Sequence, residues 1–209
     1  MKLKLYHAKW SLCSQMVRVA LHEKGLSYES KLIKLCDQYP DAENLSSEYL
    51  NINPKGIVPS LDIDGEIVTE STNIIKRLNL LHGKNDIDLW PLNVDQKKLN
   101  SWVEDTTLTD GVPLGKTLGT AIPPFSLILI NSMIKKYLTV FQALKVFWKH
   151  PLRDRGRFFL IMKFFNIQKP VAESCYKILV ESLIDIEKDL ETSGPYFLGE
   201  FTHIDINLM

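Results

Sequence analysis

The chain has 209 residues, 45% of them hydrophobic and 24% charged, with 25 basic residues balancing 25 acidic ones. This composition is typical of a soluble globular protein with one large core or two modest ones, and its low Gly and Pro content excludes a disordered or fibrous chain. A formal net charge of zero argues against general nucleic-acid binding, and three cysteines in a chain without a secretory signal indicate a reducing, cytoplasmic compartment.

The first part of the chain shows strand and helix patterns in turn. Residues 2–6 alternate polar and apolar side chains and predict a half-buried strand, and a helix is predicted from Ser14 until Gly25 closes it. A strand, a short helix, two strands and a helix are then predicted over residues 28–35, 41–50, 58–63, 66–69 and 71–83. The two adjacent strands are joined by Asp64 and Gly65, a strong hairpin signal.

The remainder of the chain is predicted to be helical. Residues 83–95 contain Gly, Asn, Asp and Pro and predict a linker between domains. Helical patterns then begin near Leu99, run over 125–148 and 157–165, and start again at Pro170. We therefore expect three parts: a domain over residues 1–82, a linker over 83–95, and an all-α domain over 96–209.

A small group of hydroxyls and one thiol lies where the first strand gives way to the first helix. Ser11, Cys13 and Ser14 are close to the predicted start of that helix. The free N–H groups at a helix N-terminus carry partial positive charge and stabilise an anion, including a thiolate. The joint therefore predicts sulfur chemistry.

Four segments follow one another in a fixed order. They read S-x-C-S-x-x-V-R-x-x-L at 11–21, N-P-x-G-x-V-P-x-L at 53–61, E-S-x-x-I at 70–74 and Y-F-L-G-E-F-T-H-I-D at 196–205. Together they resemble the cytosolic glutathione S-transferase family. The segment at 11–21 resembles zeta-like enzymes, tetrachlorohydroquinone reductive dehalogenases, lignin β-etherases and the ganglioside-induced differentiation-associated branch. The sequence alone does not distinguish among these four branches.

The resemblance implies a fold and an activity. The fold is an α/β thioredoxin-like N-terminal domain plus an all-α C-terminal glutathione transferase domain, commonly in a homodimer. The activity is attack of activated glutathione on a small hydrophobic electrophile held between the domains, as in detoxification, with no metal. The segment after 196 resembles the start of a buried helix in such proteins, and relatives continue further, so the chain looks truncated at its C-terminus.

The resemblance also assigns the glutathione site. Val58 and Pro59, joined by a cis bond, would present backbone groups to the cysteinyl part of glutathione, and Glu70 and Ser71 would hold its γ-glutamyl end. Ser11 matches the position that donates a hydrogen bond to the glutathione sulfur.

One position departs from the family pattern. Many relatives place Lys or Gln before the Val-Pro pair, where this chain has Ile57, and Lys55 or Lys34 are the cations nearby that would compensate. Ser14 is expected to cap the first helix, and Ser71 to cap the helix that follows it in addition to binding.

The helix N-terminus and one hydrogen bond can supply the free energy needed to ionise a thiol at this joint. Lowering a thiol pKa from about 8.5 by about two units requires roughly 2.7 kcal/mol. A helix N-terminus supplies about 0.3 to 2 kcal/mol and a hydrogen bond to a charged acceptor about 1.5 to 3 kcal/mol. Together the two are sufficient.

Two interpretations of Cys13 remain open. It is either a packed, inert thiol, or a nucleophile that forms a mixed disulfide with glutathione in thiol transfer or reductive dehalogenation. Cys36 and Cys175 have no motif around them and are expected to be structural. A third reading keeps the fold without catalysis, as an adaptor or membrane-associated protein.

Residues 135–165 form a basic stretch. They contain eight Lys/Arg and one acid, Asp154, interleaved with aromatic and aliphatic side chains, whereas the remainder of the chain carries −7. The stretch is either a helical hairpin packed on the α domain with its charges in water, or a surface for peripheral contact with an anionic membrane. Since no window approaches 18 consecutive apolar residues, we expect no plain spanning helix. Thr202 and Asp205 form a T-x-x-D capping pattern that predicts a helix start.

Overall fold

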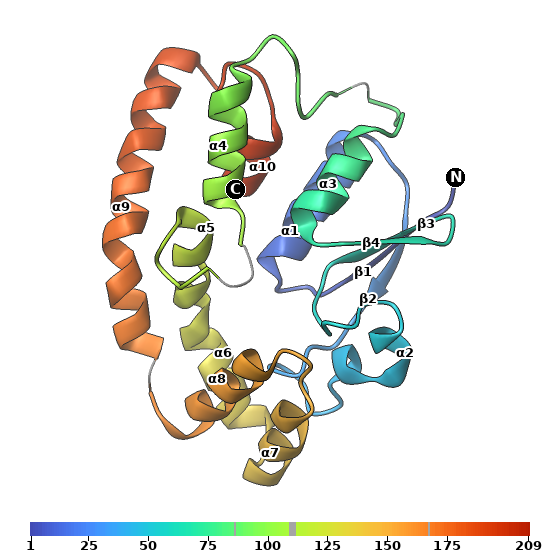
Figure 1. Ribbon diagram of the computed structural model, residues 1–209, viewed down its shortest axis with the longest axis vertical. Helices are drawn as coiled ribbons and strands as arrows, with labels where there is room; N and C mark the ends of the chain where they lie inside the picture. Colours follow the sequence, from blue (N-terminus) through green and yellow to red (C-terminus); the bar gives the residue numbers. More distant parts are fainter. Residues whose placement is uncertain (86, 109–111, 167) are drawn as a thin grey trace.

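The N-terminal part is built on a four-stranded sheet. The computed structural model describes residues 1–85, 87–108, 112–166 and 168–209 (Figure 1). The strands are β1 (Leu3–His7), β2 (Glu29–Leu32), β3 (Ser60–Ile63) and β4 (Glu66–Thr69), in the order β2-β1-β3-β4. β1 pairs parallel with β2 and antiparallel with β3, and β3 pairs antiparallel with β4. All four predicted strands are confirmed, although β2, an exposed edge strand, is shorter than predicted.

Two helices cover the face of the sheet that is turned toward the helical half. These are α1 (Leu12–Glu23) and α3 (Ser71–Asn79) (Figure 1). Side chains at helical spacing, including Val17 on α1 and Ile75 on α3, are fully buried in one apolar cluster with Leu5 of β1. The 3-10 turn η1 (Glu43–Leu45) and the short α2 (Ser47–Leu50) replace the single helix predicted over 41–50.

Turn residues set the boundaries of these elements. Gly25 follows α1 with φ of +63°, and its N–H donates to the His22 carbonyl oxygen at 2.8 Å, a hydrogen bond that satisfies the end of the helix. Asp64 and Gly65 both have positive φ between β3 and β4. This is the backbone that a two-residue hairpin requires, and it explains why these two positions were readable from sequence.

Beyond residue 95 the described residues form helices and connecting loops, with no strand. The helices are α4 (Gln96–Thr106), α5 (Leu118–Ala121), α6 (Pro123–Tyr137), α7 (Val140–Trp148), α8 (Arg153–Phe164), α9 (Gln168–Ser193) and α10 (His203–Leu208). The single helix predicted over 125–148 is wrong, because the chain breaks between α6 and α7. Thr139 caps α7, with its N–H donating to Gln142 Oε1 at 2.9 Å and its Oγ1 accepting from the Gln142 N–H at 3.3 Å.

One segment meets the length and composition of a membrane-spanning helix. It is Leu118–Tyr137, and 44% of its most apolar window is buried inside the fold. The core helix of a soluble protein meets the same criteria, and α6 contributes Leu127 and Ile134 to an apolar cluster with α7 and α8. The segment is therefore weak evidence for a membrane span.

The C-terminal helix α10 joins the two halves. The predicted capping pattern is confirmed, since Asp205 Oδ2 accepts from the Thr202 N–H at 2.8 Å. Asp205 Oδ1 also accepts from the Phe197 N–H at 2.9 Å, which holds the preceding loop. Ile206 packs in the core of the sheet domain and Ile204 in that of the helical domain. The first residues of α10 therefore belong to both cores.

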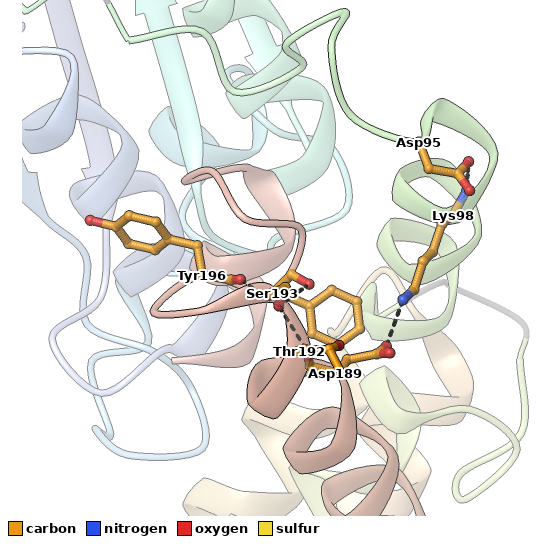
Figure 2. Close-up of polar contacts among 7 residues, drawn as sticks. Asp95, Lys98, Asp189, Thr192, Ser193 and Tyr196 are labelled. Carbon is orange, nitrogen blue, oxygen red and sulfur yellow. Dashed lines mark hydrogen bonds and ion pairs between the residues drawn. The ribbon is translucent and has the colours of Figure 1, made fainter.

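The end of α9 is fixed against α4. Figure 2 shows the Lys98 side chain of α4 reaching Asp189 of α9, with Nζ and Oδ2 2.8 Å apart. The Ser193 hydroxyl lies within 2.7–3.0 Å of the carbonyl oxygens of Asp189, Tyr196 and Phe197. These contacts set the turn that leads from the long helix α9 to α10.

Candidate functional site

The joint between β1 and α1 places Ser11 at the cap of the helix. Ser11 Oγ accepts from the Ser14 N–H at 3.3 Å. The expectation that Ser14 caps α1 is wrong, because the helix begins at Leu12 and Ser14 lies in its first turn. Ser14 is fully buried and its Oγ accepts from the Ala8 N–H at 3.3 Å. The Ser11 hydroxyl accepts one hydrogen bond and retains its proton to donate to a ligand.

Cys13 is the second residue of α1 and is half-buried. Burial raises the pKa of its thiol above the ordinary value, while the Ser71 side chain and then the Arg155 guanidinium lower it. The nearby Glu70 carboxylate raises the pKa further. The net shift is upward, so the thiol is protonated at neutral pH. Side chains at the start of α3 and on α8 thus influence the Cys13 thiol.

The turn before β3 forms one wall of the site. The bond between Val58 and Pro59 is cis, as the resemblance implied. The Ile57 carbonyl is held by the Tyr49 hydroxyl at 2.7 Å and by the Asn53 amide at 2.9 Å. Across the described residues, the Val58 N–H and carbonyl have no hydrogen-bond partner in the chain. A free backbone donor and acceptor on a partly buried residue are what a peptide ligand needs to pair with.

The start of α3 forms the second wall. Glu70 has φ of +68°, a conformation that residues other than glycine adopt at a cost and that is frequent at functional sites. It occupies the cap position without a side-chain cap bond, so the expectation that Ser71 caps α3 is wrong: Ser71 is the first helical residue. Lys55 Nζ lies 2.8 Å from Glu70 Oε1, whereas Lys34 pairs with Asp41 at 2.6 Å.

A cavity of about 320 Å³ opens at this helix start. It is lined by Lys55, Glu70, Ser71, Thr72, Asn73, Thr107 and Leu108, so both domains contribute to it. The Thr72 and Thr107 hydroxyls lie 3.0 Å apart across the domain boundary. The structure thus brings Glu70 and Ser71 to one cavity, with Cys13 beside Ser71.

Arg155 is a site residue that sequence reasoning missed. On α8 it lies opposite Arg153 and Arg157, which share the other face at a spacing of four residues. Its Cζ is 5.5 Å from the centre of the Phe159 ring, and Phe159 packs in one cluster with Cys36 of the sheet domain. The helical spacing in the sequence places Arg155 on the other face of α8 from Arg153 and Arg157. The contact of that face with the loop after β2 joins residues far apart in the sequence, so no local pattern reveals it.

The loop after β2 contributes a buried carboxylate and thiol. Asp37 Oδ1 is buried with no hydrogen-bond partner among the described residues, and burial raises the Asp37 pKa while Arg155 lowers it. Burial and the Asp37 charge raise the pKa of Cys36 to about 12, so that thiol is not ionised at neutral pH. Cys175 is also buried. In the described ranges no group of three or more His, Cys, Asp or Glu side chains is placed to hold a metal ion.

Comparison with known families and proteins assigns the N-terminal part. Residues 10–81 match the family described as glutathione S-transferase, N-terminal domain. The chain is 38% identical over 86 residues to maleylacetoacetate isomerase of Dictyostelium discoideum, which covers 41% of this chain and 38% of that protein. It is 31% identical over 103 residues to tetrachloro-p-hydroquinone reductive dehalogenase of Sphingobium chlorophenolicum, which covers 49% of this chain and 39% of that protein. The matches therefore span well under half of these relatives.

Comparison with solved structures extends over the whole chain. The β-etherase LigF of Sphingobium sp. strain SYK-6 superposes with a TM-score of 0.79 at 21% identity, covering 100% of this chain and 81% of that one. At this identity the likeness shows the fold, which is the expected thioredoxin-like domain followed by an α-helical domain. Residues 10–81 are therefore similar to the N-terminal domain of glutathione S-transferases, and the chain as a whole has the fold of the solved structures it matches.

Proposed function

We propose that this protein is a glutathione-dependent transferase that uses glutathione as co-substrate. The observation that carries the proposal is the cavity at the start of α3, where Glu70 and Ser71 meet residues of the helical domain. Glu70 would hold the ammonium of the γ-glutamyl end, and Ser71 with the first N–H groups of α3 its carboxylate. Val58 supplies a backbone donor and acceptor for the cysteinyl part.

Ser11 would stabilise the ionised sulfur. Its hydroxyl already accepts from the Ser14 N–H, which leaves the proton available for an anionic acceptor at the N-terminus of α1. A hydrogen bond to a charged acceptor contributes about 1.5 to 3 kcal/mol, and the helix terminus adds up to about 2 kcal/mol. The thiolate then attacks a small hydrophobic electrophile bound between the domains. From the resemblance to cytosolic glutathione S-transferases we also infer that the protein acts in detoxification, in the cytoplasm and as a homodimer.

A Cys13-dependent thiol transfer or reductive dehalogenation is a second candidate. Two observations favour it: the Ser71 side chain and the Arg155 charge both lower the Cys13 pKa, and the chain matches a reductive dehalogenase. The upward shift of the Cys13 pKa weighs against it, because the thiolate is the nucleophile. A third candidate is a non-catalytic adaptor, supported by Ile57 in place of a polar residue and by the pairing of Lys55 with Glu70.

One set of measurements separates the three candidates. Glutathione binding, conjugation of a generic aryl halide and reduction of a mixed disulfide are measured for the wild type, Ser11→Ala and Cys13→Ser. The transferase proposal expects binding in all three and loss of conjugation in Ser11→Ala alone. Loss of disulfide reduction only in Cys13→Ser supports redox chemistry, and binding without turnover supports the adaptor. Absence of glutathione binding contradicts both enzymatic candidates.

A further inference from the structure

Helix α7 carries a stripe of large apolar side chains that face solvent. At about 100° per residue, Val140, Phe141, Leu144 and Trp148 fall within one sector of the helix. Phe141 is 76% exposed and Trp148 is 74% exposed, and the other two are also exposed. The adjoining sector on the Val140 side carries Ala143 and Phe147, which are buried against α6 and α8. The four side chains of the stripe therefore do not take part in the packing of the core.

Cations border this stripe. Lys145 and Lys149 lie on the next sector of α7, and both are exposed. At the start of α8, Arg153 donates to the Trp148 carbonyl oxygen. Arg157 joins it in lining a cavity of about 210 Å³ together with Phe147, Trp148, Gly156 and Leu160. We call the stripe and these four cations the α7 face.

The charge of this region is one-sided. Residues 135–165 contain eight Lys/Arg and a single acid, while the rest of the chain carries −7. That acid, Asp154, is almost fully exposed and lies 3.4 Å from Arg157, so the contact is a weak surface pair. Arg155 lies on the other side of α8, with its Cζ 5.5 Å from the centre of the Phe159 ring, and is not part of the α7 face. The cations of the face are thus directed at solvent beside exposed aromatic side chains.

We propose that the α7 face binds the surface of an anionic lipid membrane. A row of aromatic and aliphatic side chains bordered by Lys and Arg is the arrangement that lies in the lipid interface, where the apolar side enters and the cations meet anionic headgroups. Figure 1 places α7 at the end of the helical half away from α10 and the α3–α4 connection. A membrane on this face leaves the cavity at Glu70 and Ser71 open, so binding and glutathione chemistry are independent.

The test is co-sedimentation of the full chain with phosphatidylcholine vesicles that contain or lack phosphatidylserine. We expect sedimentation only with the anionic vesicles, weakened by added salt. Phe141→Ser/Trp148→Ser and Arg153→Glu/Arg157→Glu should each reduce binding on the order of tenfold or more. Matched controls are Leu92→Ser, a large apolar side chain that is 89% exposed outside the face, and Lys177→Glu/Lys188→Glu on α9. These should bind as the wild type does.

A second readout reports on Trp148 itself. Quenching of tryptophan fluorescence by brominated lipid should occur in the wild type and be lost in Trp148→Phe. No sedimentation with anionic vesicles, or equal loss in the controls, overturns the proposal. If the face variants instead convert a dimer to a monomer in sedimentation velocity without altering vesicle binding, the face joins two copies and the proposal is wrong. Glutathione binding measured on the same variants should be unchanged, so failure of this proposal is distinguishable from failure of the transferase function.

Discussion

Two side chains from distant elements control the thiol of Cys13. Ser71 of α3 and Arg155 of α8 both lower its pKa against the effect of burial. Replacing Arg155 by Gln removes a positive charge and is expected to raise the Cys13 pKa further, which slows alkylation of the native protein at mildly alkaline pH. The measurement is the rate of iodoacetamide labelling of Cys13 across pH. Arg153→Gln, on the opposite face of α8, is the control, and equal profiles for both variants would show that Arg155 does not act on Cys13.

Two buried histidines make the fold sensitive to acid. Burial and then the Arg155 charge lower the pKa of His150 to about 4, and burial and then Lys76 lower that of His203 to about 3. An unfolded chain binds these protons near pH 6.5, so it binds more protons than the fold below that value. Stability should therefore fall as the pH drops below about 6.5. The raised pKa of Asp37 acts in the opposite direction.

The histidine prediction is checked by urea unfolding between neutral pH and about pH 4. The ring centre of His203 lies 4.6 Å from that of Trp90. The variant His203→Met replaces the imidazole with an apolar side chain that does not titrate and still fills the space beside Trp90. Its stability should depend less steeply on pH than that of the wild type. An identical slope in the two proteins would show that His203 is not held neutral by the fold.

At the scale of elements, the cap of α7 determines where the helical run breaks. The Thr139 hydroxyl accepts from the Gln142 N–H, and Thr139→Ala removes that acceptor. The expected cost is about 1 kcal/mol in the free energy of unfolding, measured with urea. Thr192→Ala is the control, since that hydroxyl donates to a carbonyl within α9 at no helix start. Equal stabilities of the two variants would contradict the role of the cap.

The contact of α7 with α8 depends on the missing side chain of Gly156. A Cβ at this position would lie 2.3 Å from the Phe147 carbonyl oxygen, which is too close. Ala in place of Gly within a helix stabilises by about 1 kcal/mol where space allows. We expect Gly156→Ala to destabilise the protein by about 1 to 3 kcal/mol instead, because α8 must move away from α7. A stabilised variant, in thermal or urea unfolding, would contradict this packing.

Local signals made much of the fold predictable. The Asp64-Gly65 hairpin, the close of α1 at Gly25 and the Thr202 cap each depend on residues within a few positions of one another. The break at Thr139 carried a signal too, a T-x-x-Q cap, but it lies inside a strongly apolar run that reads as one helix.

Long-range contacts account for what sequence reasoning missed in the site. The positions of Val58, Glu70 and Ser71 came from resemblance, and the structure places Glu70 and Ser71 at one cavity. Arg155 was missed because its position depends on α8 packing against the loop after β2, a contact that no local pattern reveals. The capping role of Ser14 was assigned wrongly, since several hydroxyls at one helix start compete for it and the fold buries this one.

At the scale of the molecule, the two domains are joined in two places on either side of the site. The helix α10 places Ile206 in the core of the sheet domain, and Cys36 of the sheet domain packs with Phe147 and Phe159 of the helical domain. The cavity at the start of α3 lies at the same domain boundary. Interdomain sites of this kind bind small molecules in many proteins.

Titration of bound glutathione shows directly whether Ser11 stabilises the glutathione thiolate. The ultraviolet absorbance of the thiolate is titrated against pH for glutathione bound to the wild type, to Ser11→Ala and to Ser126→Ala, a surface serine of α6 whose hydroxyl donates to the Pro123 carbonyl oxygen at 2.7 Å. We predict a bound pKa about two units below that of the free thiol in the wild type and the control, and a pKa near the free value in Ser11→Ala. Bound glutathione that titrates like free glutathione in the wild type, or a low pKa that survives Ser11→Ala, would contradict the account.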